Sequence, residues 1–230
     1  NARNACLNFL KKKKPSYIGF IDDDCTLSQY WLINAFKIMR KFNADIVTGP
    51  QLYNKKFIND KKLNFTEFFE KKYKKGNARV KWAATNNVLF KFNTIEKSNL
   101  KFDMNLNKFG MGEDQLFFSQ LSKLGKRIYW SNKMQVTEAV HNHRQNVQWL
   151  SQRSFRLGVL GNYIDRKIYG NSLGFLINYL KTIYFLFKFI LILLSPFKKN
   201  YLVYLNNYFF RALGKFLGPF IFSKVGFSKK

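Results

Sequence analysis

Three consecutive aspartates, Asp22 to Asp24, follow the apolar run at residues 17–21. A short apolar run predicts a strand, and open α/β sheets place their ligand sites where strands end. Neighbouring carboxylates repel one another, so a turn that keeps three of them favours a bound cation. Oxygen ligands suit Mg²⁺ or Mn²⁺, with diphosphate oxygens completing the shell. The alternative is a solvated acidic loop.

A second acidic pair, Glu113 and Asp114, comes directly after Gly110-Met111-Gly112 and opens a helical pattern. The positive end of a helix dipole stabilises an ionised carboxylate. An ionised acid within hydrogen-bond reach of a sugar hydroxyl acts as a general base, which makes Asp114 the candidate. The glycine-bearing segment before it is suited to a pocket floor or a moving loop. An ordinary acidic helix start is the alternative.

Basic and histidine side chains later in the chain offer anion and metal contacts. Arg153 and Arg156 are three residues apart, share a helix face and suit a diphosphate leaving group. A solvated basic face explains them equally well. His141 and His143 follow an expected strand and are candidates for a metal site, although unpaired histidines are more often structural.

Apolar runs alternate with helical patterns up to about residue 169, which predicts an α/β domain. We expect strands at residues 17–21, 45–48, 86–91, 127–130 and 134–140, and a Lys/Asn-rich loop at 53–62. A helix with Leu32, Phe36 and Met39 on one side should follow the aspartates. Further helices are expected at a capping box over 93–96, from 113 to a terminating Gly125, and from about Val147.

Composition limits the class of protein. A chain of 230 residues with 47% hydrophobic content supports one core plus an appendage. The net charge of +27 indicates anionic partners such as lipid surfaces or phosphorylated ligands, although a general compositional bias contributes to it. Cys6 and Cys25 have no redox or metal-ligand spacing, which fits a reducing compartment. No signal peptide is recognisable at Asn1, and the chain is expected to be a fragment.

Two hydrophobic stretches, at residues 173–194 and 201–222, set the C-terminal part apart from the rest. The first is long enough to cross a bilayer. Basic residues precede the first stretch, separate the two and follow the second, which fits interfacial or re-entrant helices better than a spanning hairpin. We therefore expect a catalytic domain at residues 1–170 and a membrane-associated helical hairpin at 171–230, on an anionic membrane surface.

The ordered motifs resemble the inverting family 2 glycosyltransferases with a GT-A fold. The resemblance covers roughly residues 1–160 and depends on the whole set rather than on one motif. Its residues are Ala2-Arg3-Asn4, the strand and aspartates at 17–24, Thr85-Asn86-Asn87, Gly112-Glu113-Asp114 and the Arg-rich run at 149–158. The fold implied is a GT-A-like mixed sheet flanked by helices, followed by the hydrophobic helices.

The resemblance also implies roles for individual residues. Arg3 would belong to the nucleotide site, and Asp22 and Asp23 would approach the ribose. Asp24 would bind the metal, and Asp114 would deprotonate the acceptor hydroxyl for in-line attack with inversion. Glu113 would help to hold the acceptor, and the arginines at 153 and 156 would stabilise the departing nucleotide diphosphate.

The implied partners are a nucleotide-sugar donor and a glycan or lipid-linked acceptor on the cytoplasmic face of the cell membrane, in envelope polysaccharide biosynthesis. Family members carry nucleotide-binding strand and helix units upstream of the Arg-Asn element. That region is missing here, so this stretch of chain is expected to be N-terminally truncated and to bind donor poorly.

Two alternatives of other kinds are open. Residues 22–26 after an apolar strand also fit the nucleophile motif of haloacid-dehalogenase-like phosphatases, with Asp22 as nucleophile and Asp24 as general acid. That superfamily's later acidic motif should follow a strand, whereas Glu113 and Asp114 follow a Gly/Asn-rich loop. A non-catalytic basic module is the other alternative. No nucleic acid is expected as a partner, because the basic residues are scattered and no nucleic-acid motif appears.

Overall fold

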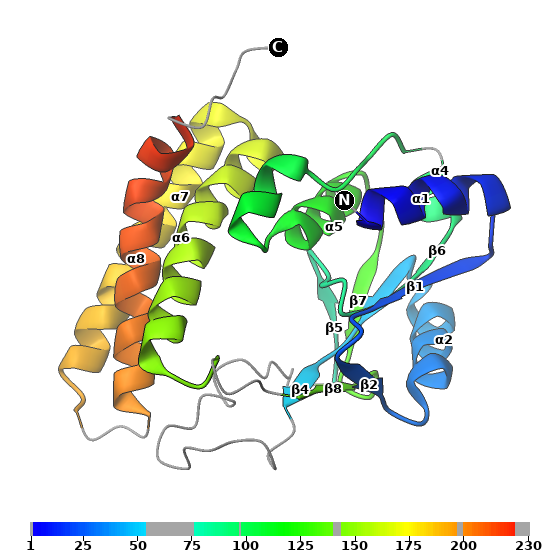
Figure 1. Cartoon of the computed structure of the whole chain (residues 1–230), viewed down its shortest axis with the longest axis horizontal. Helices are drawn as coiled ribbons and strands as arrows, with labels where there is room; N and C mark the ends of the chain where they lie inside the picture. The colour runs from blue at the N-terminus through cyan, green and yellow to red at the C-terminus, as the bar shows by residue number, and fades with distance from the viewer. Residues whose placement is uncertain (1, 54–75, 97, 140–143, 197–199, 224–230) are drawn as a thin grey trace. The chain divides into compact units, whose positions relative to one another are not determined.

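The structure is a computed structural model that describes residues 2–53, 76–96, 98–139, 144–196 and 200–223. Close contacts divide these residues into two compact units. The first runs to Ala139, and the second contains three long C-terminal helices. The division falls before the composition change at residue 170, because the first of these helices packs against the other two. Each unit is described by itself below (Figure 1).

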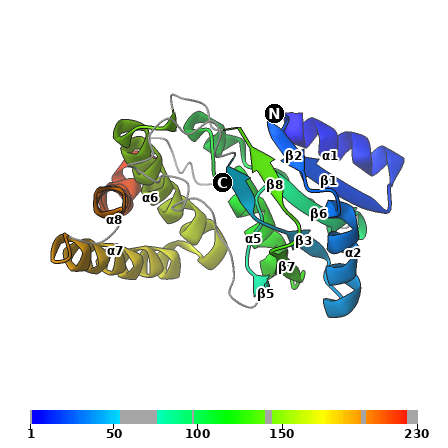
Figure 2. The ribbon, with the colours of Figure 1, turned by 90° about the horizontal axis from the view of Figure 1, so that it is seen from below.

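The first unit contains two mixed sheets. The larger has the strand order β1 (Tyr17–Ile21), β6 (Asn87–Lys91), β3 (Ile46–Thr48), β7 (Ile128–Ser131) and β5 (Asn77–Val80). Its β3 and β7 are parallel and its other pairs antiparallel. The smaller sheet has the order β2 (Cys25–Leu27), β8 (Val136–Glu138) and β4 (Gln51–Tyr53). Figure 2 shows β1, β6, β3 and β7 side by side.

Helices cover both faces of the larger sheet, because successive strand residues point to opposite sides. Val47 and Leu89 pack under α2 (Trp31–Phe42), whereas Ile46 and Phe90 face the other layer. That layer consists of α1 (Ala2–Lys13), α4 (Asn93–Glu96) and α5 (Glu113–Lys123), with the 3-10 helix η2 (Met104–Phe109) leading into α5. Figure 1 shows α2 across the sheet from α1.

The expected α/β class is confirmed, as a mixed sheet flanked by helices and followed by hydrophobic helices. The predicted strands and helices are all present with slightly different bounds. Of the three residues expected on one side of α2, Met39 is buried and Phe36 packs against the core, whereas Leu32 is 49% exposed. The buried residues of this helix are Trp31, Ala35, Ile38 and Met39. Of the expected loop at 53–62, Tyr53 ends β4 and the remainder lies outside the described residues.

Asn87 and Gly49 hold the two sheets together at the start of β6. The fully buried Asn87 amide donates to the carbonyls of Pro50 at 3.1 Å and Met134 at 2.8 Å. Its oxygen accepts from the Trp31 indole at 2.7 Å. A Cβ atom at Gly49 would lie 1.9 Å from the Met134 carbonyl oxygen, so only glycine permits this approach. The sheet edge that carries the aspartates is therefore tightly fixed.

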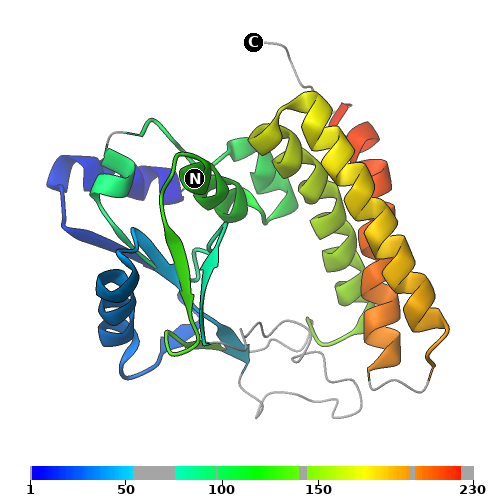
Figure 3. The ribbon, with the colours of Figure 1, turned by 180° about the vertical axis from the view of Figure 1, so that it is seen from behind.

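The second unit contains α6 (Val147–Tyr169), α7 (Asn171–Leu193) and α8 (Tyr201–Ser223). The three helices pack on one another, with the most extensive contact between α6 and α8 (Figure 3). Glycines allow the close approach, since a Cβ atom at Gly158 would lie 2.5 Å from the Arg211 carbonyl oxygen and one at Gly214 2.2 Å from that of Phe155.

Candidate active site

Strand pairing brings the aspartate turn and the segment before β6 to one edge of the larger sheet. β1 and β6 are antiparallel, and Ile21 pairs with Asn87. Asp22, which follows β1, and Thr85, which precedes β6, therefore leave the sheet at the same edge. The Thr85 backbone N–H donates to Asp114 Oδ2 at 3.4 Å. The start of α5 thus meets this edge, although it is more than 80 residues from the aspartates in sequence.

Helix α1 is held in place through Asn4. The Asn4 side chain donates to the Phe102 carbonyl at 2.9 Å and accepts from the Phe102 N–H at 2.8 Å. Leu7, one turn further on, is buried in the core. These contacts determine where the neighbouring residue Arg3 can reach. In the Arg3-Asn4 element, Asn4 therefore fixes the position of helix α1 and Arg3 supplies a charge.

Arg3 connects the two acidic segments. Its guanidinium forms an ion pair with Asp22 at 3.6 Å and another with Glu113 Oε1. The Glu113 side chain is 12% exposed, whereas that of Asp22 is 44% exposed. The Glu113 contact is therefore the better shielded and the stronger of the two. Glu113 Oε2 is buried with no hydrogen-bond partner in the described part of the chain.

Asp114 occupies the first turn of α5. Gly112 precedes this helix with φ +94°, a conformation that favours glycine and turns the chain into α5. Asp114 Oδ1 accepts from the Gln115 N–H at 2.7 Å. Burial and the neighbouring Glu113 charge raise the pKa of Asp114 to about 6, and its backbone hydrogen bonds and Arg3 oppose this rise. The carboxylate is therefore mostly ionised at neutral pH, with a basicity well above that of an ordinary aspartate.

The raised pKa of Asp114 predicts a pH-dependent loss of stability. The folded state holds its proton more tightly than the unfolded chain, so unfolding free energy falls as pH rises from the ordinary pKa of 3.8 to about 6. Asp114→Asn removes this effect. Relative to wild type, the variant should gain about 1–3 kcal/mol of stability between pH ~4 and pH ~7. Urea unfolding at both pH values measures the gain, and a pH-independent difference would contradict it.

Asp24 lies at the start of the smaller sheet. The Cys25 thiol is 3.7 Å from Asp24 Oδ1, and burial together with the charge of Asp24 raises the pKa of Cys25 to about 12. Cys25 is paired in register with the buried Glu138 of β8. Burial raises the pKa of Asp22, and Asp24 and Asp23 raise it further, whereas Arg3 lowers it. The aspartate turn therefore concentrates negative charge.

The carboxylates of this turn are hard oxygen ligands and fit Mg²⁺ or Mn²⁺ chemically. Within the described ranges, no three His, Cys, Asp or Glu side chains are grouped closely enough to hold a metal ion by themselves. Ligands from a bound diphosphate would be needed to complete the shell. His141 and His143, the other candidates for metal ligands, lie outside the described residues.

Glu138 was not predicted as a site residue, because it is a single acid in a three-residue strand with no motif spacing. Its position beside the aspartate turn follows from pairing between β2 and β8, which are more than 100 residues apart.

Arg153 and Arg156 are both on α6, as expected, but they belong to the second unit. Arg153 lies over the Trp149 ring at 5.1 Å, and the Arg156 Nε donates to the Gln152 carbonyl at 3.4 Å.

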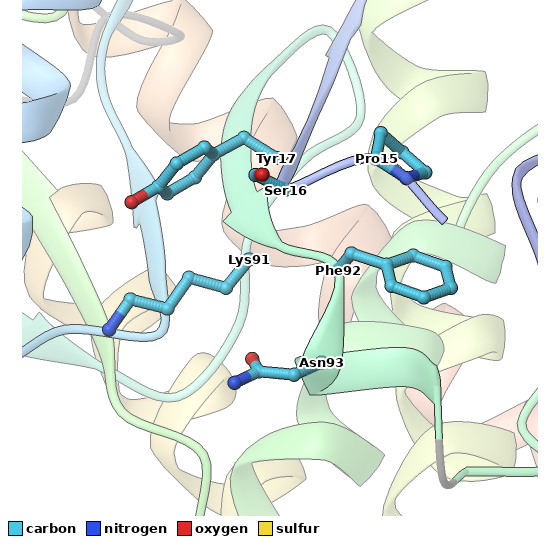
Figure 4. A pocket seen from close by; sticks show the side chains of 6 residues that line it. All are labelled: Pro15, Ser16, Tyr17, Lys91, Phe92 and Asn93. Carbon is cyan, nitrogen blue, oxygen red and sulfur yellow. The ribbon is translucent and has the colours of Figure 1, made fainter. Parts of the chain in front are cut away.

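A surface pocket at the other end of β1 and β6 is separate from the acidic cluster. Figure 4 shows its lining residues Pro15, Ser16, Tyr17, Lys91, Phe92 and Asn93. Tyr17 begins β1 and pairs with Lys91, whereas Asp22 follows the end of that strand. At about 3.3 Å per strand residue, the two places are roughly 16 Å apart. This pocket therefore plays no part in the acidic site.

Helix α7 of the second unit exposes most of its large apolar side chains. On α7, the buried residues include Gly174, Asn178 and Thr182. Twelve of its large apolar side chains are exposed: Leu173, Phe175, Leu176, Tyr179, Leu180, Ile183, Tyr184, Leu186, Phe187, Ile190, Leu191 and Leu193. Among the described helices, α7 is long and apolar enough to cross a membrane, and only 17% of its most apolar stretch is buried. A helix on the surface of a water-soluble protein turns its apolar side chains toward the core, whereas most of those on α7 are exposed.

The first unit is an α/β domain with carboxylates gathered at one edge of its larger sheet. Residues 1–101 match the family model described as glycosyl transferase family 2, so this portion of the chain is similar to that family.

Two further comparisons extend past that portion. Over 170 residues the chain is 28% identical to the succinoglycan biosynthesis protein ExoM of Rhizobium meliloti (strain 1021), covering 74% of this chain and 54% of that protein. The chain thus spans about half the length of this curated relative. The crystal structure of A197 from STIV is similar at 22% identity and a TM-score of 0.42, over 60% of this chain and 66% of that one.

Proposed function

We propose that this protein transfers a sugar from a nucleotide-sugar donor to a hydroxyl of a glycan or lipid-linked acceptor, with inversion at the anomeric carbon. The observation that carries the proposal is the position of Arg3 between Asp22 and Glu113. Through Arg3, Asp22 after β1 and Glu113 at the start of α5 lie around one guanidinium. The family match over residues 1–101 favours glycosyl transfer over the phosphatase alternative.

Asp114 is the proposed general base. It is partly buried, and its pKa of about 6 leaves it ionised at neutral pH yet more basic than a solvent-exposed aspartate. Its neighbour Glu113 offers the buried oxygen Oε2, which has no hydrogen-bond partner among the described groups. A buried acceptor atom without a donor is costly, so a ligand hydroxyl is a natural partner. Glu113 would in this way hold the acceptor beside the base.

The donor is proposed to bind beside Asp22, whereas the acceptor is proposed to bind beside Glu113. Asp22 and Asp23 would contact the ribose, and Arg3 would neutralise charge near the nucleotide. Asp24 and Asp22 would hold Mg²⁺ or Mn²⁺ together with the donor diphosphate. When bound, the ion supplies positive charge that stabilises the departing nucleotide diphosphate.

Asp24→Ala should weaken metal binding. Loss of one carboxylate ligand is expected to lower Mn²⁺ affinity by about 10- to 100-fold, comparable with other losses around metal sites. Isothermal titration with MnCl₂, alone and with a panel of nucleoside diphosphates, measures this loss. Asp23→Ala is the matched control for the titration with MnCl₂ alone, because it removes a neighbouring charge but no proposed metal ligand. Equal Mn²⁺ affinity for wild type and Asp24→Ala would remove the metal assignment.

The second unit is proposed to attach the enzyme to the cytoplasmic face of the cell membrane. Helix α7 buries Asn178 and Thr182 and exposes most of its large apolar side chains, which a lipid surface would cover. The excess of Lys and Arg near the helix ends would face anionic headgroups. A membrane-bound acceptor would put the enzyme in envelope polysaccharide assembly, which is consistent with its similarity to the succinoglycan biosynthesis protein ExoM.

A further inference from the structure

The surface pocket at the end of the larger sheet opposite the aspartates carries polar groups that the fold does not use. It is lined by Pro15, Ser16, Tyr17, Lys91, Phe92 and Asn93 and has a volume of about 310 Å³ (Figure 4). Small-molecule sites occupy roughly 300–1,000 Å³, so there is room for a small ligand group. The four polar side chains of the lining form no hydrogen bond or ion pair within the described ranges.

The backbone around this pocket is fixed by strand pairing. Tyr17 and Lys91 are paired in register at the ends of β1 and β6, and the Phe92 N–H donates to the Ser16 carbonyl at 3.1 Å. The Lys91 N–H donates to the Asp45 carbonyl at 3.0 Å. The polar side chains therefore project from a rigid frame, which lowers the entropy cost of binding a ligand.

Three of the polar side chains extend to the same side of the sheet. Figure 4 shows Tyr17, Lys91 and Asn93 on one side, whereas the Phe92 ring extends to the other side, where it is buried in the core. Strand residues alternate between the two faces, which explains this arrangement. The Tyr17 ring packs edge-on against Phe36 of α2, with centroids 4.9 Å apart, and Tyr17 is still 41% exposed. An aromatic ring of fixed position thus lies beside an ammonium and an amide.

The segments that form the pocket are strongly basic. Residues 11–17 and 91–96 contain five lysines and one acid, Glu96. Four of these lysines, Lys11 to Lys14, lead directly into Pro15. Asp45, whose carbonyl lies next to the pocket, has its carboxylate engaged by Arg127, through the backbone N–H at 2.8 Å and the side-chain Nε at 3.8 Å. The field at the pocket therefore favours an anionic ligand.

The types of polar group select among anionic ligands. The hydroxyl groups of Ser16 and Tyr17 and the amide of Asn93 both donate and accept hydrogen bonds, whereas phosphate oxygens are chiefly acceptors. Sugar hydroxyls also do both, and the apolar face of a sugar ring can pack against an aromatic side chain. The described lining contains no arginine, so the fork that matches phosphate is missing. A single ammonium suits a single carboxylate.

We propose that this pocket binds one carboxylate-bearing sugar of an acidic glycan. The carboxylate pairs with Lys91, the sugar ring packs against Tyr17, and hydroxyl groups bond to Ser16 and Asn93. Because the pocket lies roughly 16 Å along the strands from the aspartates, the bound sugar does not occupy the acidic site. This second glycan contact is independent of the catalytic assignment, and its occupancy can be measured without turnover.

The test compares two forms of one oligosaccharide. Tetragalacturonic acid carries a carboxylate on every sugar, and its methyl ester has the same chain without the charge. Isothermal titration of the full chain in a nonionic detergent, at constant ionic strength, should show about tenfold tighter binding of the acid, equivalent to roughly one charge-assisted hydrogen bond. Lys91→Gln should lower the affinity for the acid to that for the ester. Tyr17→Leu should weaken the binding of both forms and leave their ratio unchanged.

Lys133→Gln is the matched control for general charge. This exposed lysine follows β7 at the edge of the sheet that carries the aspartates, so its loss removes one charge away from the pocket and should keep the preference for the acid. Lys91→Arg keeps a cation in place and should also keep the preference. Thermal unfolding of both Gln variants should match wild type, because neither lysine side chain forms a hydrogen bond within the described ranges.

Three results would overturn the site as proposed. The first is equal binding of the acid and the ester by the wild-type chain, or no binding of either. The second is a preference that survives Lys91→Gln, or one that Lys133→Gln lowers as much. The third is displacement of tetragalacturonic acid by an equal concentration of inorganic phosphate, which would identify phosphate rather than a saccharide as the ligand.

Discussion

Asp114→Asn is expected to lower sugar turnover by about two to four orders of magnitude, the usual contribution of a general base. The amide keeps the shape of the side chain, and its oxygen can still accept from the Gln115 N–H. It cannot take a proton from the acceptor hydroxyl. Donor binding should therefore persist while transfer is lost. Rates of labelled sugar transfer, in a preparation where the wild-type protein is active, measure the effect.

The pH profile provides an independent check on the same residue. Wild-type turnover should rise with pH as Asp114 ionises around its pKa of about 6, and the residual activity of the variant should lack this rise. Asp103→Asn is the matched control, because Asp103 caps the helix η2 and asparagine preserves that capping interaction. An Asp114→Asn variant that keeps more than about a tenth of wild-type turnover would exclude Asp114 as the base.

Sequence patterns predicted the acidic segments well because their signals are local. An apolar run before the three aspartates and a glycine before Glu113 define a strand end and a helix start without reference to the rest of the chain. That these segments meet at Arg3 depends on two distant facts. The antiparallel register of β1 with β6 sets the edge, and the Asn4 contact with Phe102 docks α1. Neither the strand register nor the Asn4 contact produces a periodic pattern in the sequence.

Three short strands were not predicted from the sequence, because they too depend on pairing with distant parts of the chain. β2 and β4 have three residues each and β5 has four, which is too few for an alternating pattern to be recognised. They are stabilised by pairing with β7 or β8 rather than by their own propensity. The long C-terminal helices showed the opposite behaviour. Their apolar composition was evident, but which side would be buried was not, because the buried side mixes apolar residues such as Ile164 with small and polar ones such as Gly158 and Asn178.

Membrane affinity should depend on the outward face of α7. Leu176, Leu180 and Phe187 lie on one side of this helix and are 51%, 56% and 56% exposed. Burial of one such side chain contributes about 1.5–3 kcal/mol, so replacing all three with glutamine should reduce vesicle partitioning by roughly a thousandfold. Co-sedimentation with phosphatidylglycerol-containing vesicles measures the change. The small inward residues are untouched, so the helices should remain folded.

A control on the first unit makes this prediction specific. Phe9, Leu32 and Leu124 are 58%, 49% and 62% exposed, which matches the α7 set in residue type and in exposure. Their triple replacement by glutamine removes as much exposed apolar surface but leaves α7 intact. If lipid contact is confined to the helices of the second unit, this second variant should bind vesicles as tightly as wild type does. Equal losses for the two triple variants would show that exposed hydrophobicity in general, rather than the face of α7, drives the attachment.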